Sequence, residues 1–109
     1  MTKVIITKVA RLSLLNLEGF KARTVGIKQA QEIIDKLIAE STKSISENPG
    51  IHHRNIEALA RGLTLYEWID PVNQYKVLYT YNGSQAVINM FCNTREDFSR
   101  LLYVIMIAH

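Results

Sequence analysis

An Asn-Gly dipeptide at residues 82–83 separates two β-rich segments, and this arrangement constrains the fold more than any other feature of the chain. Residues 75–81 (Tyr-Lys-Val-Leu-Tyr-Thr-Tyr) precede it, and residues 84–91 (Ser-Gln-Ala-Val-Ile-Asn-Met-Phe) follow it. Asn-Gly between two such runs is the strongest short-range hairpin signal, because both central residues of a type I′ turn need a positive φ. The sequence therefore predicts two antiparallel strands joined by a type I′ turn.

Two helices are expected before this hairpin. Residues 10–23 form the less regular of the two, because Leu12 and Leu15 lie beside the apolar positions Leu14 and Leu17. Residues 28–46 have the clear i, i+3, i+4, i+7 spacing of a helix with one buried face. An Asn-Pro-Gly sequence at residues 48–50 ends this second helix, since proline disfavours the helical conformation in the residue before it.

Shorter elements complete the prediction. We expect a first strand at residues 4–7, a loop with a helical turn at 51–62, a strand at 63–69 and a final helix at 94–108. The resulting order is β-α-α-β-β-β-α. It predicts one α+β domain over residues 1–109, with a small antiparallel β-sheet, an N-terminal αα-hairpin packed on one face and a C-terminal helix.

Composition restricts the compartment but not the activity. The chain has 13 Lys and Arg against 10 Asp and Glu, a formal charge of +3 that suits a nucleic acid or an acidic partner without requiring either. Its single cysteine, Cys92, permits no internal disulfide and fits a reducing cytoplasm, where we expect a buried thiol. We expect no signal peptide, and the longest apolar run is far shorter than the roughly 20 residues that span a bilayer.

The expected C-terminal helix is apolar on more than one face. Phe98, Leu101, Leu102 and Ile105 form one stripe, and most of the remaining surface is also apolar. A domain of this size has little material with which to cover a terminal helix completely. Part of this helix is therefore expected to contact another chain, either a partner segment or a second copy. The alternative is that the terminal residues are buried within their own domain.

No cofactor or metal motif is present in the sequence. The adjacent His52 and His53 would point apart in an extended chain, and no carboxylate or cysteine stands at ligand spacing, so neither a metal nor a cofactor is expected.

A set of basic and proton-transferring residues remains. Metal-independent RNA cleavage needs cations for the phosphate, and also a base and an acid. The candidate cations are Lys76, Arg95 and Arg61, and the candidate proton-transfer groups are His53, Glu67 and Tyr103.

Each candidate also has a purely structural interpretation. Lys76 would be a lysine that extends from the sheet edge, His53 a solvated loop residue and Tyr103 a filler of an interface. Tyr66 and Trp68 could stack on a displaced base, or they could be core aromatics.

The order and spacing of these segments resemble the RelE/ParE superfamily of toxins from toxin–antitoxin modules. The resemblance covers nearly the whole chain and is carried by residues 47–49 (Glu-Asn-Pro), 65–68 (Leu-Tyr-Glu-Trp), 75–79 (Tyr-Lys-Val-Leu-Tyr) and 94–98 (Thr-Arg-Glu-Asp-Phe). It implies a growth-arresting toxin of the plasmid-stabilisation type, which is neutralised by a co-encoded antitoxin. The chain would then form either a homodimer or a hetero-oligomer with the antitoxin.

The resemblance implies two modes of action. One branch of the superfamily cleaves mRNA on the ribosome, and the other poisons DNA gyrase without enzymatic activity. The cleavage branch is our first expectation, with Lys76, Arg95 and Arg61 on the phosphate. Many members of the superfamily have His where this chain has Asn93, and Asn cannot act as a general base. Many also have Arg where this chain has Lys76, and lysine keeps the charge but cannot bind phosphate in the bidentate manner of arginine. A third alternative is a dimeric interaction module without toxicity.

Overall fold

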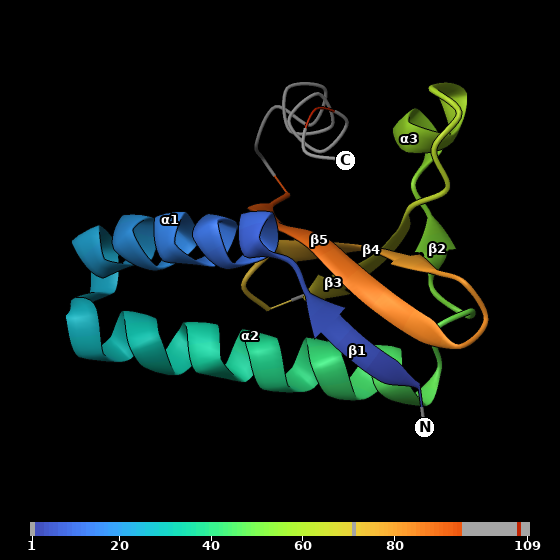
Figure 1. The fold of residues 1–109 in the computed structure, drawn as a ribbon. Coiled ribbons are helices and arrows are strands. Elements are labelled where there is room, and N and C mark those ends of the chain that lie inside the picture. Colours follow the sequence, from blue (N-terminus) through green and yellow to red (C-terminus); the bar gives the residue numbers. More distant parts are fainter. Residues whose placement is uncertain (1, 71, 95–106, 108–109) are drawn as a thin grey trace.

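The computed structural model describes residues 2–70, 72–94 and 107 of the chain (Figure 1). Its elements follow in the order β1 (Lys3–Ile6), α1 (Lys8–Val25), α2 (Ile27–Glu47), β2 (His53–Arg54), α3 (Ile56–Ala60), β3 (Tyr66–Asp70), β4 (Tyr75–Tyr81) and β5 (Gln85–Asn93). The predicted helix at 94–108 lies almost wholly outside the described residues. None of the described helices is both long and apolar enough to cross a membrane.

The strands form one five-stranded sheet in the order β1-β5-β4-β3-β2. The α+β class and the helical hairpin packed on one face of the sheet are confirmed. The expectation of a wholly antiparallel sheet is wrong in one respect, because β1 pairs with β5 in parallel, from Lys3 opposite Gln85 to Ile6 opposite Ile88. The physical reason is that α1 and α2 carry the chain from β1 at one edge of the sheet to β2 at the other edge. No short turn joins β1 to β5, so their pairing need not be antiparallel.

The helical hairpin begins and turns at residues suited to those positions. The Thr7 hydroxyl caps α1 by accepting a hydrogen bond from the Ala10 N–H at 3.1 Å. Gly26 ends α1 and precedes α2 with φ at 89°, a left-handed conformation that costs glycine little. Figure 1 shows the two helices running antiparallel beside the sheet.

Two apolar clusters lie on opposite faces of the sheet. The larger one, called the helix-side core below, joins Leu14 and Leu37 of the two helices to Val77, Tyr79 and other residues of β4 and β5. The smaller one consists of Ala58, Leu65, Leu78, Met90 and Cys92, which are all buried. Because side chains alternate along a strand, β4 supplies its odd-numbered residues to the first cluster and Leu78 to the second. The face of the second cluster, on which Ala58 of α3 packs, is called the α3-side face below.

The predicted hairpin is confirmed, but its turn is not of type I′. The last strand pair is Tyr81 with Ala86, so that four residues form the loop. Gly83 has a φ of 95°, whereas Asn82 does not have a positive φ. The Asn82 Oδ1 instead accepts hydrogen bonds from the N–H groups of Ser84 and Gln85. The asparagine therefore stabilises this turn through its side chain.

Candidate functional site

The α3-side face carries an ion pair between strands β3 and β4. The Lys76 Nζ on β4 lies 3.4 Å from the Glu67 Oε2 on β3. Strand register places Glu67 opposite Leu78 and Lys76 opposite Ile69, so the two charged residues are diagonal neighbours. Their side chains are only 15% and 19% exposed, respectively. Lys76 is therefore a half-buried residue of a central strand, and its charge is balanced by a carboxylate of the next strand.

Asn55 connects this ion pair to α3. Its Nδ2 donates a hydrogen bond of 2.9 Å to the Glu67 Oε2, and its Oδ1 accepts one of 2.8 Å from the Ala58 N–H as the N-cap of α3. Its backbone N–H also donates to the Leu65 carbonyl. Asn55 is buried, with 6% of its surface exposed. One amide side chain therefore fixes both the orientation of the Glu67 carboxylate and the position of the short helix above the sheet.

Of the other predicted site residues, one lies on the same face of the sheet as this ion pair. His53 is exposed on the edge strand β2, and its register partner is Glu67, so it belongs to the same face of the sheet. Arg61 is exposed at the C-cap of α3, where its backbone N–H donates to the Ala58 carbonyl. Arg95 and Tyr103 lie outside the described residues. The structure thus brings Lys76, Glu67 and His53 to one face.

The two aromatic residues considered for base stacking lie on the opposite face. Tyr66 and Trp68 pack against the helix-side core, because they alternate with Glu67 along β3. The Tyr66 ring stacks on Tyr79 at a centroid distance of 5.5 Å, and the Arg54 guanidinium lies 5.9 Å from the Tyr66 centroid. The geometry therefore separates the stacking candidates from Lys76.

Tyr79 anchors this aromatic group in the interior. Its side chain is fully buried, and its hydroxyl donates a hydrogen bond of 2.6 Å to the Pro49 carbonyl. Burial, followed by the neighbouring Tyr66, raises the pKa of Tyr79 well above its ordinary value of 10.0. Sequence reasoning missed this contact, because residues 49 and 79 are far apart in the chain and no local pattern connects them.

The end of β5 contributes two further residues of interest. Cys92 is the register partner of Lys76 and is 1% exposed, which confirms the expectation of a buried thiol. Asn93 pairs with Tyr75 and so belongs to the same face as the helix-side core. Asn93 is therefore on the other face of the sheet from Lys76.

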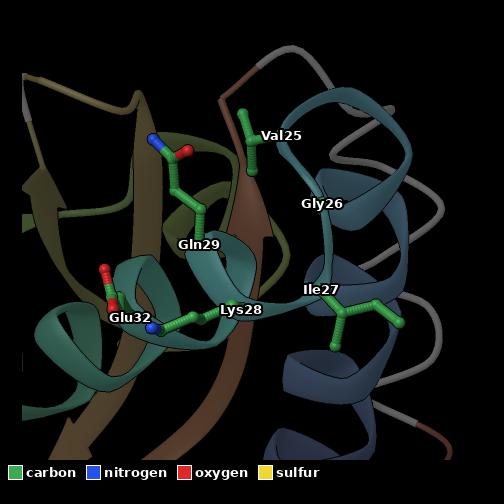
Figure 2. A pocket seen from close by; sticks show the side chains of 6 residues that line it. All are labelled: Val25, Gly26, Ile27, Lys28, Gln29 and Glu32. Carbon is green, nitrogen blue, oxygen red and sulfur yellow. The ribbon is translucent and has the colours of Figure 1, made fainter.

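A shallow hollow at the turn between α1 and α2 is remote in sequence from these residues. Figure 2 shows the side chains around it, which come from Val25, Gly26, Ile27, Lys28, Gln29 and Glu32. Its charged side chains are one lysine and one glutamate, and it contains no histidine or cysteine. Within the described part of the chain, no group of three or more His, Cys, Asp or Glu side chains could hold a metal ion.

Comparison with known proteins supports the fold. No protein-family model matches the sequence, and no curated protein matches it. Among solved structures, a chain from the chromosomal ParDE TA (toxin–antitoxin) system of P. aeruginosa is similar, with a TM-score of 0.73 and 14% sequence identity. The similarity covers 87% of this chain and 98% of that chain. At this level of identity the similarity shows that the two chains share a fold.

Proposed function

We propose that this chain is the toxin of a type II toxin–antitoxin module, neutralised by a co-encoded antitoxin in the cytoplasm. The main support is the fold, which is similar over nearly its whole length to a chain from a ParDE toxin–antitoxin system. Two of the four segments that carry the sequence resemblance, residues 65–68 and 75–79, lie mainly in β3 and in β4, and β4 includes Lys76. A toxin of this class arrests growth when its antitoxin is absent.

For the mode of action, we propose binding to a protein target such as DNA gyrase, without RNA cleavage. The ion pair between Lys76 and Glu67 is the observation that carries this choice. A phosphate-binding cation should offer its charge to the ligand, whereas the charge of Lys76 is already balanced at 3.4 Å. The aromatic candidates for base stacking, Tyr66 and Trp68, belong to the other face.

Ribosome-dependent mRNA cleavage is the second candidate, and one observation favours it. His53 and Glu67 are register partners on the face that also carries Lys76. One group that can transfer protons, Glu67, therefore contacts the cation, and a second, His53, lies opposite Glu67 on the next strand. A cation with two such groups is the minimum set for metal-independent cleavage of RNA. In this mode, the phosphate would displace Glu67 from Lys76, and Arg61 and Arg95 would add positive charge.

Induced expression in a bacterium separates these functions. Growth is followed together with pulse-labelled protein synthesis and pulse-labelled DNA synthesis. Loss of DNA synthesis with filamentation is expected for the gyrase-type function. Rapid loss of translation with DNA synthesis preserved would instead support cleavage of mRNA. Absence of growth arrest would contradict the proposal that the chain is a toxin.

A pair of matched variants tests the role of the ion pair directly. Lys76→Met keeps the apolar stem of the side chain and removes its charge, and it should leave the arrest of growth intact if no RNA is cleaved. Lys36→Met is the control, because Lys36 forms an exposed ion pair with Glu40 on α2. Both variants must keep the far-ultraviolet circular dichroism spectrum of the wild type. A Lys76→Met protein that is folded but no longer toxic would favour the RNA-cleaving function.

A further inference from the structure

The loop between β4 and β5 directs three hydrogen-bond donors at one side-chain oxygen. The Asn82 Oδ1 accepts from the Ser84 N–H at 3.0 Å, from the Ser84 hydroxyl at 3.0 Å and from the Gln85 N–H at 2.9 Å. Donors grouped around a carbonyl oxygen stabilise the negative charge that develops on it when a nucleophile attacks the carbonyl carbon. Asn82 is also exposed, so water can reach its polarised amide.

The main-chain nitrogen of Gly83 is the nucleophile next to this amide. Within the part of the chain that the structure describes, the Gly83 N–H donates no hydrogen bond. Gly83 is exposed, and a Cβ atom built on it would meet nothing within 4 Å, so a base in the solvent can reach the N–H proton. Attack of this nitrogen on the Asn82 Cγ is intramolecular and closes a succinimide ring. No second molecule therefore has to be positioned for the reaction.

Other asparagines lack one part of this arrangement. Asn55 and Asn89 are buried, with 6% and 3% of their surface exposed. Asn48 precedes a proline, whose nitrogen has no proton to lose. The N–H groups that follow Asn73 and Asn93 donate to backbone carbonyls at 3.0 and 2.9 Å. Among these sites, an exposed amide, its donors and an available glycine nitrogen therefore coincide only in the loop between β4 and β5.

We propose that Asn82 is a site of intramolecular deamidation, an inference that goes beyond the proposed function and does not depend on it. Hydroxide or a buffer base removes the Gly83 N–H proton, and the nitrogen bonds to the Asn82 Cγ while the C=O electron pair moves onto Oδ1. The intermediate then expels Nδ2, which takes a proton from water and leaves as ammonia, and the base is regenerated. Water opens the remaining succinimide at either carbonyl and gives aspartate or isoaspartate. In total, one amide and one water become one carboxyl group and one ammonia.

The isoaspartate product changes the connection between the two longest strands. Its main chain runs through the former Asn82 side chain, so the link to Gly83 is lengthened by the Cβ carbon. Strands β4 and β5 pair as far as Tyr81 opposite Ala86, and both supply buried residues to the helix-side core. A longer link shifts this register or strains the turn. Isoaspartate should therefore destabilise the sheet, whereas aspartate keeps the Oδ1 acceptor and should not.

Ageing of the purified full-length chain tests the proposal. Tandem mass spectrometry of the tryptic peptide 77–95 measures deamidation at Asn82 against Asn89 and Asn93 in the same peptide, and labelling by an isoaspartate methyltransferase detects isoaspartate. Asn82 should deamidate at least about 10-fold faster than the other two. Its rate should rise with pH, because the reaction begins when base removes the Gly83 proton.

Two matched variants test the role of the donors. Ser84→Ala removes one of them and should slow deamidation of the folded protein by about 3- to 10-fold, whereas Ser84→Thr keeps the hydroxyl and should stay within about 2-fold of the wild type. In guanidinium chloride the turn is lost, so Ser84→Ala and the wild type should deamidate at equal rates. Circular dichroism before ageing establishes that both variants are folded.

The possible outcomes decide between a reactive and a protected amide. Deamidation of folded Ser84→Ala at or above the wild-type rate would show that the hydrogen bonds protect Asn82, and it would overturn the proposal. An Asn82 that stays intact in the folded chain and deamidates only after unfolding would overturn it as well. An isoaspartate-containing fraction with the urea midpoint of fresh protein would overturn the inferred effect on the sheet, for which Asn82→Asp is the control. None of these outcomes bears on growth arrest, which tests the proposed function separately.

Discussion

Removal of the ion pair between Lys76 and Glu67 should cost measurable stability, and its magnitude follows from the geometry. At the observed 3.4 Å, Coulomb attraction ranges from about 1 kcal/mol in bulk water to about 5 kcal/mol at an effective dielectric constant of about 20. The side chains are 19% and 15% exposed, so the pair has lost part of its hydration, which offsets much of this gain. We therefore expect a coupling energy of about 1–3 kcal/mol.

A double-mutant cycle measures this coupling without the contributions of the single side chains. Glu67→Gln keeps an oxygen to accept the hydrogen bond from Asn55, and Lys76→Met keeps the apolar stem. The free energy of unfolding of the wild type, both single variants and the double variant is obtained from urea denaturation. The double variant should lose less stability than the sum of the losses in the two single variants. The reason is that each single variant leaves one half-buried charge without the opposite charge of this pair.

The exposed pair of Lys36 and Glu40 on α2 provides the matched cycle. These side chains are 72% and 49% exposed and lie 3.8 Å apart at i,i+4 spacing. Their coupling should be about 0.3–0.5 kcal/mol, as is typical for pairs on a helix surface. A coupling between residues 67 and 76 no larger than this control would refute the reasoning. It would mean that solvent screens Lys76 and that its charge is available to a ligand.

Three further predictions concern stability. Tyr79→Phe should lower the free energy of unfolding by about 1–2 kcal/mol, since it leaves a buried carbonyl without a donor, whereas Tyr81→Phe, whose hydroxyl bond is exposed, should cost less than about 0.5 kcal/mol; urea denaturation compares the two. Burial raises the pKa of Tyr75 and Tyr79, so the folded protein keeps protons that the unfolded chain releases. The free energy of unfolding should therefore fall as the pH rises above 10, the ordinary pKa of tyrosine. Denaturation at several alkaline pH values should show a weaker fall for Tyr79→Phe than for the wild type. Asn55→Ala should cost about 1–3 kcal/mol, because it removes both the N-cap of α3 and the donor to Glu67, and equal stability of variant and wild type in thermal unfolding would contradict this account.

The parts of the fold that sequence reasoning predicts correctly are those with a local cause. The strand Tyr75–Tyr81 has the predicted bounds, and α2 (Ile27–Glu47) differs from its prediction by one residue at each end. Alternation and helical periodicity are properties of neighbouring residues, so they can be read from a single sequence. The sequence predicts a turn at Asn82 but with the wrong geometry, because hydrogen bonds accepted by the Asn82 side chain stabilise a four-residue loop.

The parts that could not be predicted depend on residues distant in the chain. The parallel pairing of β1 with β5 joins residues 3–6 to residues 85–88, and no local pattern indicates it. A register shift in the pairing of β4 with β5 leaves Asn89 opposite no residue of β4, and it changes which residues of β5 share a face beyond that point. Asn89 is buried at 3% exposure, and its Nδ2 donates to the Val87 carbonyl, a local bond that the sequence does not announce.

The candidate site illustrates the same division with a functional consequence. The sequence identifies Lys76 as a cation within an apolar strand, and that feature alone suggests a phosphate ligand. Its carboxylate partner is visible only when the register of β3 and β4 is known, because Glu67 becomes its diagonal neighbour across the sheet. A cation that has a half-buried counter-charge must lose that interaction before it binds phosphate, and the loss is subtracted from the affinity for RNA. This cost is the physical reason for proposing that the chain contacts a protein and does not cleave RNA.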